Sequence, residues 1–144
     1  MKLTTKTRYG TLALIEIARN QARSKTTKRK DISQVQPIPE SYLESILSEL
    51  RNSGLVDTTR GPKGGFVLSR QPSQITMFEI LTALQGDLSL TDCTNSVNGK
   101  CCNNYPCNAR WFWLKLEKNI EKTLRSTTLQ ELVDKNESSD QYVI

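Results

Sequence analysis

The sequence predicts a mainly α-helical protein with a small β-hairpin and a long C-terminal helix. Three observations lead to this prediction. Apolar residues recur every three or four positions in several segments, a glycine-rich hexapeptide separates two short extended runs, and a long periodic segment follows a cluster of cysteines. With 144 residues, 36% of them hydrophobic, one domain with a modest core is expected. A large multidomain enzyme is excluded.

Three helices are predicted in the N-terminal half. The first covers residues 7–20, where the apolar stripe is broad enough to be buried on more than one side. A short amphipathic helix covers residues 31–35, with Ile32 and Val35 facing inward. The third begins near Pro39, because proline in a first turn gives up only an N–H group that has no partner there. Its apolar residues follow the helical i, i+3, i+4, i+7 spacing: Leu43, Ile46, Leu47 and Leu50.

A hairpin is predicted next. The extended runs 55–59 and 66–68 are joined by the sequence RGPKGG, whose three glycines and one proline favour a tight tip. Helix, short helix, helix and hairpin is the order of a winged helix–turn–helix. In that fold the second helix of the pair enters the major groove of DNA, and the hairpin, or wing, contacts the DNA backbone or the minor groove.

The C-terminal half predicts further helices around an irregular segment. Thr76 and Glu79 form a capping-box pattern that begins a helix ending at Gly86, and a second such pattern begins a short helix at Thr128. A long helix over residues 108–125 has an apolar stripe made of Trp113, Leu116, Ile120 and Leu124. The stripe is interpreted as the seam of a dimer, with packing against its own domain as the alternative.

These elements divide the chain into four parts. A winged helix–turn–helix DNA-binding domain is expected over residues 1–86 and a cysteine-rich loop over 87–107. A dimerisation helix and a C-terminal helix are expected over 108–134. The tail over 135–144 is expected to be frayed.

Charge is unevenly distributed along the chain. Residues 1–70 contain 13 Lys and Arg against 6 Asp and Glu, whereas residues 71–144 contain 7 against 9. A basic half of this size favours a polyanionic partner, nucleic acid ahead of a membrane surface, although a basic surface without a partner would have the same balance. No run of about 18 apolar residues and no signal-peptide core is present, so a cytoplasmic protein without a membrane partner is expected.

The chain has no histidine. This excludes hydrolases that use an imidazole base, and it excludes zinc or haem sites with a histidine ligand. No acid and base are paired by their spacing either. The sequence therefore favours a binding protein over an enzyme.

The polar face of the third helix and the hairpin tip contain the candidate DNA-binding residues. Glu44 can accept a hydrogen bond from the amino group of cytosine, and the serines can contact bases or phosphates. An ordinary solvated helix face would have the same composition. The hairpin weakens that alternative, because its glycines let basic residues approach a phosphate or a narrow minor groove. The complete set is Ser41, Tyr42, Glu44, Ser45, Arg51, Arg60 and Lys63.

Four cysteines lie within 15 residues: Cys93, Cys101, Cys102 and Cys107. In a reducing compartment such a cluster favours metal binding or thiol chemistry over structural disulfides, and its polar surroundings give free cysteines no packing role. Four thiolates can hold zinc or an iron–sulfur cluster. A metal or cluster is the favoured interpretation, and a thiol redox switch is the alternative.

Five segments together resemble the family of the iron–sulfur cluster regulator IscR, whose relatives include NsrR, RirA and CymR. They are MKLTTKTRYG, PESYLESILSELRNSGLV, TRGPKGGFVLS, the cysteine loop and TTLQELVD, and the resemblance covers about residues 1–134. It implies a homodimeric winged-helix transcription regulator, usually a repressor, that binds a pseudo-palindromic operator in double-stranded DNA. It also implies that the long helix crosses the partner subunit and that a cluster in the cysteine loop alters DNA binding.

The resemblance also implies roles for individual residues. By position, Ser41, Tyr42 and Glu44 match the base-contacting segment and Arg60 matches the wing arginine. The three cluster cysteines of the family match Cys93, Cys101 and Cys107. Because the CymR-like branch lacks such cysteines, their presence favours a cluster-bearing member, with a metal-free CymR-type regulator as the alternative.

The fourth cluster ligand of the family is not matched. IscR-like members have a histidine where this chain has Arg110, and the nitric-oxide-sensing members use an aspartate where it has Arg8. Cys102 is the favoured substitute, because thiolate is the softest donor present. Asp92, a small molecule, or three cysteines alone are the alternatives. A 2Fe–2S cluster is favoured, and 4Fe–4S stays possible.

Overall fold

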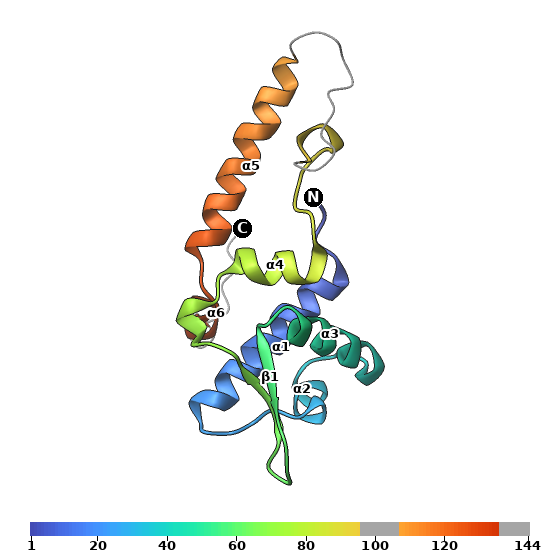
Figure 1. Ribbon diagram of the computed structural model, residues 1–144, viewed down its shortest axis with the longest axis vertical. Coiled ribbons are helices and arrows are strands. Elements are labelled where there is room, and N and C mark those ends of the chain that lie inside the picture. The colour runs from blue at the N-terminus through green and yellow to red at the C-terminus, as the bar shows by residue number, and fades with distance from the viewer. Residues whose placement is uncertain (96–106, 136–144) are drawn as a thin grey trace.

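The computed structural model describes residues 1–95 and 107–135 (Figure 1). Its helices are α1 (Thr5–Ala22), α2 (Arg29–Val35), α3 (Glu40–Asn52), α4 (Met77–Gln85), α5 (Asn108–Ser126) and α6 (Leu129–Asp134). The strands are β1 (Val56–Thr59) and β2 (Gly65–Leu68), and two 3₁₀ turns are η1 (Pro72–Gln74) and η2 (Asp92–Thr94). The predicted fold class, a mainly α-helical winged helix–turn–helix with a long C-terminal helix, is confirmed.

The core lies where α1, α3 and α4 meet. The four apolar residues predicted on one face of α3 are all buried, and each stabilises the fold by about 1.5–3 kcal/mol on leaving water. Gly10 of α1 permits this contact, because a Cβ atom there would lie 2.3 Å from Leu84 Cδ1 and 3.3 Å from Ile46 Cγ2. A side chain at position 10 would therefore force Leu84 to shift where α3 and α4 both approach α1.

The helix pair α2–α3 follows the prediction except at one residue. Ile32 is buried as expected. The prediction that Val35 faces inward is wrong, since this residue is 61% exposed. The chain leaves the helix at this point, with Gln36 already in an extended conformation, and Ile38 in the turn is buried instead. Because Ile38 and the apolar face of α3 pack into the core, the polar face of α3 points outward.

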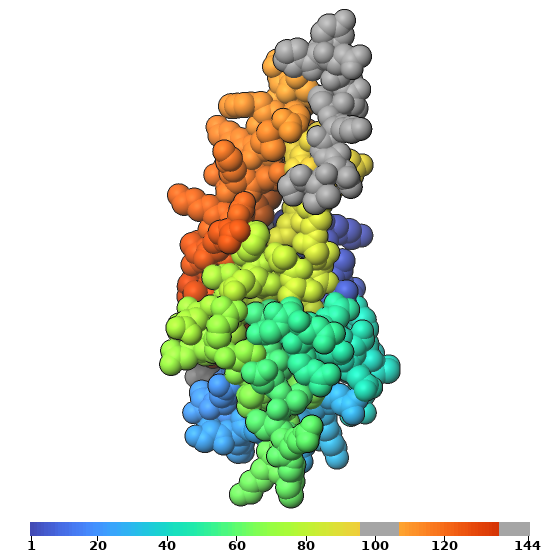
Figure 2. Space-filling model, viewed as in Figure 1, coloured from blue at the N-terminus to red at the C-terminus, as the bar shows by residue number. Residues whose placement is uncertain are grey.

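The hairpin forms the predicted wing. β1 and β2 pair in antiparallel fashion, with Val56 opposite Leu68. The hairpin is attached to the α1–α2 connection, because Thr27 and Phe66 exchange two backbone hydrogen bonds of 3.1 and 2.7 Å. The wing protrudes at the bottom of the molecule as drawn (Figure 2). This attachment fixes its direction relative to the helix pair.

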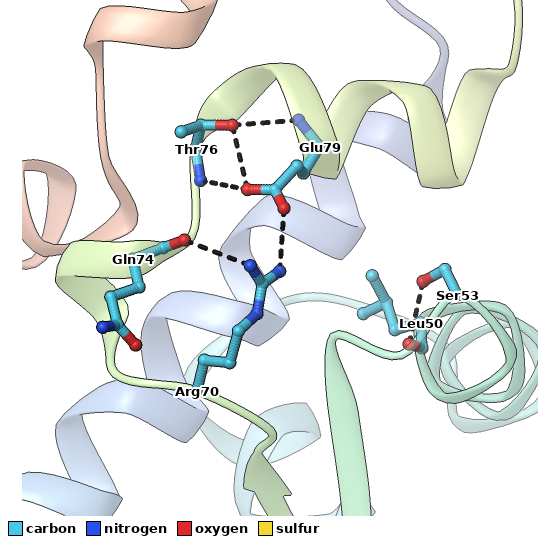
Figure 3. A network of polar contacts seen from close by, with 6 residues as sticks. All are labelled: Leu50, Ser53, Arg70, Gln74, Thr76 and Glu79. Atoms are coloured by element: carbon cyan, nitrogen blue, oxygen red, sulfur yellow. Dashed lines mark hydrogen bonds and ion pairs between the residues drawn. The ribbon is translucent and has the colours of Figure 1, made fainter.

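A polar network fixes the start of α4 (Figure 3). The Thr76 hydroxyl accepts a hydrogen bond from the Glu79 N–H (3.3 Å), and the Glu79 carboxylate accepts one from the Thr76 N–H (2.9 Å), so the predicted capping box is confirmed. Arg70 donates to the Glu79 carboxylate (2.8 Å) and to the Gln74 carbonyl (3.4 Å). The network connects the end of the hairpin to α4.

The Glu79 carboxyl group has a lowered pKa. Partial burial raises its pKa, but hydrogen bonds from the Thr76 backbone and from Arg70 outweigh burial and move the pKa below its ordinary value of 4.5. A carboxylate with a lowered pKa stabilises the folded state above the unfolded-state pKa. That contribution is lost as the pH falls through the lowered pKa.

α5 projects from the body of the molecule, whereas α6 packs back onto it (Figures 1 and 2). No residue of α5 is fully buried, while Leu129 of α6 is completely buried. Backbone hydrogen bonds from Met77 to Thr127 (2.9 Å) and from Leu129 to Ile75 (2.8 Å) join the α5–α6 connection to the start of α4. The capping box predicted at Thr128 is confirmed. Neither α5 nor any other helix in the described ranges is long and apolar enough to cross a membrane.

Glu79→Gln is expected to lower the free energy of unfolding at pH 7 by about 0.5–1 kcal/mol, because the charged cap and the Arg70 ion pair are lost and partial solvent exposure keeps both effects small. The difference from the native protein should begin to shrink near pH 4.5, where the unfolded chain takes up a proton, and should continue to shrink as the pH falls through the lowered pKa of the folded protein. Urea denaturation at pH 7 and at lower pH measures this. Thr82→Ala, at an exposed position of α4, is the control and should leave the stability nearly unchanged. If the loss of unfolding free energy in Glu79→Gln did not vary with pH, the lowered pKa of Glu79 would be contradicted.

Candidate nucleic-acid interface and cysteine segment

The outward face of α3 presents most of the predicted DNA-binding residues. The exposed ones are Ser41, Glu44, Ser45 and Arg51. Tyr42 is half-buried, because its ring packs edge-to-face on Tyr9 of α1 with 5.9 Å between the ring centroids. The exposed face combines hydroxyl groups, a carboxylate and a guanidinium. These groups can form hydrogen bonds with base edges and phosphates.

Arg29, at the start of α2, contacts this face and was not predicted from the sequence. Its Nη1 lies 2.9 Å from Glu44 Oε2. The two residues belong to different helices, and the turn between α2 and α3 brings them together. No local spacing indicates such a pair. The only available sign was that Arg29 belongs to a run of three basic residues, 28–30.

The tip of the wing holds Arg60 and Lys63 on a sharply turned backbone. Both residues are exposed. Gly64 donates a backbone hydrogen bond to Gly61 (2.8 Å). A Cβ atom at Gly64 would lie 2.4 Å from the Thr59 carbonyl oxygen, so only glycine fits this turn. The turn places the two basic side chains next to a backbone that a phosphate can approach closely.

The α1–α2 connection supports the wing from one side. The Thr26 hydroxyl donates to the Lys63 carbonyl (2.6 Å), and the Lys28 ammonium group donates to the Pro62 carbonyl (3.4 Å). The start of α2 therefore contacts both the wing and, through its ion pair, α3. Together these three elements form one surface of positive charge and hydrogen-bonding groups, which suits a polyanion such as DNA.

Two of the four cysteines lie at the ends of the cysteine segment within the described residues. Cys93 is in η2 and Cys107 is the N-cap residue of α5, and both are partly exposed. Arg110 Nε donates to the Cys93 carbonyl (3.2 Å), which attaches Cys93 to the first turn of α5. Cys101, Cys102 and residues 136–144 of the predicted tail lie outside the described residues. Within residues 1–95 and 107–135, no three potential ligands form a metal-binding group.

Hydrogen bonds give residues 87–95 a defined place against α5. Glu117 of α5 accepts from the Leu90 N–H (2.6 Å) and from the Thr94 hydroxyl. Asp87 accepts from the hydroxyl and the backbone N–H of Ser89 (2.6 and 3.0 Å), and the pKa of its carboxyl group is lowered by these bonds. Glu117 and Asp87 were not among the predicted site residues, since nothing in their spacing indicates a loop anchor.

The structure shows the contacts and exposure of Arg110 and Arg8, which occupy the family's fourth-ligand positions, and of Asp92. Arg110 is bonded to the Cys93 carbonyl, and Arg8 is exposed on α1. Asp92 is exposed beside Cys93, and among these three it alone has a ligating oxygen. Of the fourth ligands predicted from the sequence, Asp92 is the one that lies within the described residues.

A hollow of about 350 Å³ lies between α4 and α5. Its apolar walls are Phe78, Leu88, Ile120 and Leu124, and the Arg125 guanidinium lies 3.7 Å from the centre of the Phe78 ring. Two residues of the predicted stripe thus face their own domain. The other two, Trp113 and Leu116, do not line the hollow.

The outward face of α3, the wing and the basic surface between them define a winged helix–turn–helix DNA-binding protein. The chain belongs to the Rrf2 family, whose family model, described as "Iron-dependent Transcriptional regulator", matches residues 3–135. The resemblance found in the sequence is thereby confirmed.

Two named relatives are similar over nearly the whole chain. The HTH-type transcriptional regulator IscR of Cronobacter sakazakii is 36% identical over 140 residues, which cover 97% of this chain and 85% of IscR. CymR of Bacillus subtilis is 36% identical over 132 residues, 92% of this chain and 89% of CymR. The solved structure of that CymR, the global cysteine regulator, has a TM-score of 0.80 at 34% identity and covers 93% and 97% of the two chains. The structure of T. potens IscR has a TM-score of 0.77 at 28% identity and covers 99% and 95%.

Arg60→Ala is expected to weaken binding to duplex DNA by about tenfold at physiological salt, because a phosphate or minor-groove contact is lost. The slope of the logarithm of the binding constant against the logarithm of the salt concentration should become less negative by about one. Fluorescence anisotropy with labelled DNA over a series of salt concentrations measures both quantities. Lys122→Ala, which removes the same charge from the exposed face of α5, is the control. Equal affinities for the native and Arg60→Ala proteins would contradict wing insertion.

Proposed function

We propose that the protein is a homodimeric repressor whose operator affinity depends on an iron–sulfur cluster held by Cys93, Cys101 and Cys107, with Cys102 as the favoured fourth ligand. The observation that supports this most is that both described cysteines are attached to the start of α5, Cys107 as its N-cap and Cys93 through Arg110. Two recognition helices of a symmetric dimer suit a pseudo-palindromic operator with half-sites about 34 Å apart. Such a regulator acts in the cytoplasm and needs no catalytic centre.

The donor set is compatible with such a cluster. Thiolates are the usual ligands of iron–sulfur clusters, and Cys93 and Cys107 are partly exposed rather than packed in the core. The Arg110 guanidinium beside Cys93 places positive charge where thiolates and a cluster would add negative charge. A cluster, when bound, supplies a redox-active group that cross-links the thiolates. We favour 2Fe–2S, with 4Fe–4S as the alternative, since cysteine thiolates hold both types of cluster.

Hydrogen bonds offer a route from the cysteine segment to the recognition helix. Gln85, at the end of α4 where the segment begins, accepts from the Thr4 N–H (3.3 Å) and the Thr7 hydroxyl (3.2 Å) of α1. α1 is joined to α3 by the ion pair of Lys6 and Glu49 (2.9 Å). A change in the order of the segment therefore acts on α4 and α1, and through them on the position of α3.

The exposed apolar edge of α5 supports a dimer. Trp111 and Phe112 are 64% and 48% exposed. Phe112 and Leu116 are one helical turn apart, and neither lines the hollow between α4 and α5. A second copy of the chain, pairing along α5, would remove this edge from water.

A metal-free regulator of the CymR type is the second candidate. The identity to CymR, 36%, equals that to IscR. In this alternative an external oxidant such as a peroxide takes two electrons from the thiols of Cys101 and Cys102, and the resulting disulfide or sulfenic acid alters DNA binding. A colourless, iron-free protein that binds its operator after anaerobic purification would favour this candidate.

Cys107→Ala is expected to abolish the visible absorption of the anaerobically purified protein and to reduce its iron and sulfide to background, because a cluster ligand is lost. Cys102→Ala is the matched comparison. It should retain part of the absorption if an external group can replace a fourth thiolate. Unchanged absorption and iron content in Cys107→Ala would contradict the ligand assignment.

Leu116→Asp is expected to convert the dimer to a monomer at micromolar concentration, because a charge is placed in the apolar seam. Sedimentation velocity measures the change. Lys122→Asp, at an exposed position about 120° round α5 from Leu116, is the control and should remain dimeric. A Leu116→Asp dimer, or a native protein that is monomeric, would contradict the proposed seam.

A further inference from the structure

The ion pair of Arg29 and Glu44 joins the two helices of the DNA-binding unit on the surface that faces DNA. The Arg29 Nη1 and Glu44 Oε2 atoms are 2.9 Å apart, and the two side chains are 47% and 69% exposed. An ion pair this exposed adds little to folding stability. Its position suggests a role in binding.

The neighbours of Arg29 explain why it contacts Glu44. The Asp31 carboxylate accepts a hydrogen bond from the Lys28 N–H (2.8 Å), so the acidic group nearest in sequence is engaged in capping α2. The Lys28 ammonium group is directed to the wing, where it donates to the Pro62 carbonyl (3.4 Å). Two successive basic residues thus contact the two DNA-facing elements, Lys28 the wing and Arg29 the recognition helix.

A carboxylate on a recognition helix must be held firmly to be selective. Near DNA it is repelled by the phosphates, and it gains a hydrogen bond only where a cytosine amino group lies within reach. Glu44 has a long side chain with several rotatable bonds, and that side chain is 69% exposed. Arg29 offsets its charge and restricts its position, and the planar guanidinium has five N–H donors, so it can bind the carboxylate and a phosphate together.

We propose that Arg29 is a specificity-determining positioning residue, which holds the Glu44 carboxylate so that it selects cytosine at one position of each operator half-site. The inference rests on the proposed DNA-binding function and adds a residue to it. Loss of Arg29 should relax the base preference at that position, whereas loss of an ordinary phosphate contact should weaken binding to every sequence equally.

The test is selection from a random-sequence duplex DNA library with the full-length protein, followed by competition binding on the selected motif. Arg29→Gln should lower the preference for cytosine at one position by about tenfold, and Glu44→Gln should lower it at the same position. Arg29→Gln added to Glu44→Gln should change that preference no further. Arg29→Lys, which keeps the charge but not the fork of donors, should recover part of it.

Lys30→Gln is the matched control, since it removes the same charge from the neighbouring exposed residue. It should weaken all sequences alike and keep the motif. If Arg29→Gln behaves as Lys30→Gln does, with every base preference unchanged, the inference is overturned while the proposed function stands. If the native protein enriches no motif, the proposed function itself is overturned, and the inference with it.

Discussion

The close approach of α3 and α4 to α1 at Gly10 is the constraint on which the rest of the structure depends. A side chain at this position would collide with Leu84 of α4 and press on Ile46 of α3. α1 also contacts β2 and α6, so one helix supports the recognition helix, the base of the wing and the helix that leads to the cysteine segment. The close contact at Gly10 therefore helps to position α3 and α4 on the helix that also supports the wing.

The two functional regions lie at opposite ends of the molecule (Figure 1). The wing and α3 are in the lower half as drawn, and η2 is beside α5 in the upper half. The proposed function requires only a small energy to pass between them, because a tenfold change in DNA affinity corresponds to about 1.4 kcal/mol. That is the size of one or two hydrogen bonds such as those of Gln85 with α1, so polar contacts at the helix ends are sufficient to connect the regions.

Local patterns predicted the elements but not the contacts between them. The capping boxes at Thr76 and Thr128 could be predicted because their partners are three residues away. The Arg29–Glu44 ion pair and the Thr27–Phe66 bridge could not, because they depend on how helices and strands fold back on one another. Val35 was assigned to the wrong side because helical spacing alone does not indicate where a helix of seven residues ends. The sequence shows that Arg110 occupies the position of the family's histidine ligand, and only the structure shows its hydrogen bond to the Cys93 carbonyl.

The most direct test of a cluster-dependent repressor is operator affinity measured on one anaerobic preparation before and after the cluster is removed by a chelator. Iron and sulfide analysis of both samples establishes the cluster content. The proposed function predicts that the two affinities differ by about tenfold or more, since the order of the cysteine segment changes. Equal affinities for fully loaded and fully cluster-free protein would contradict it.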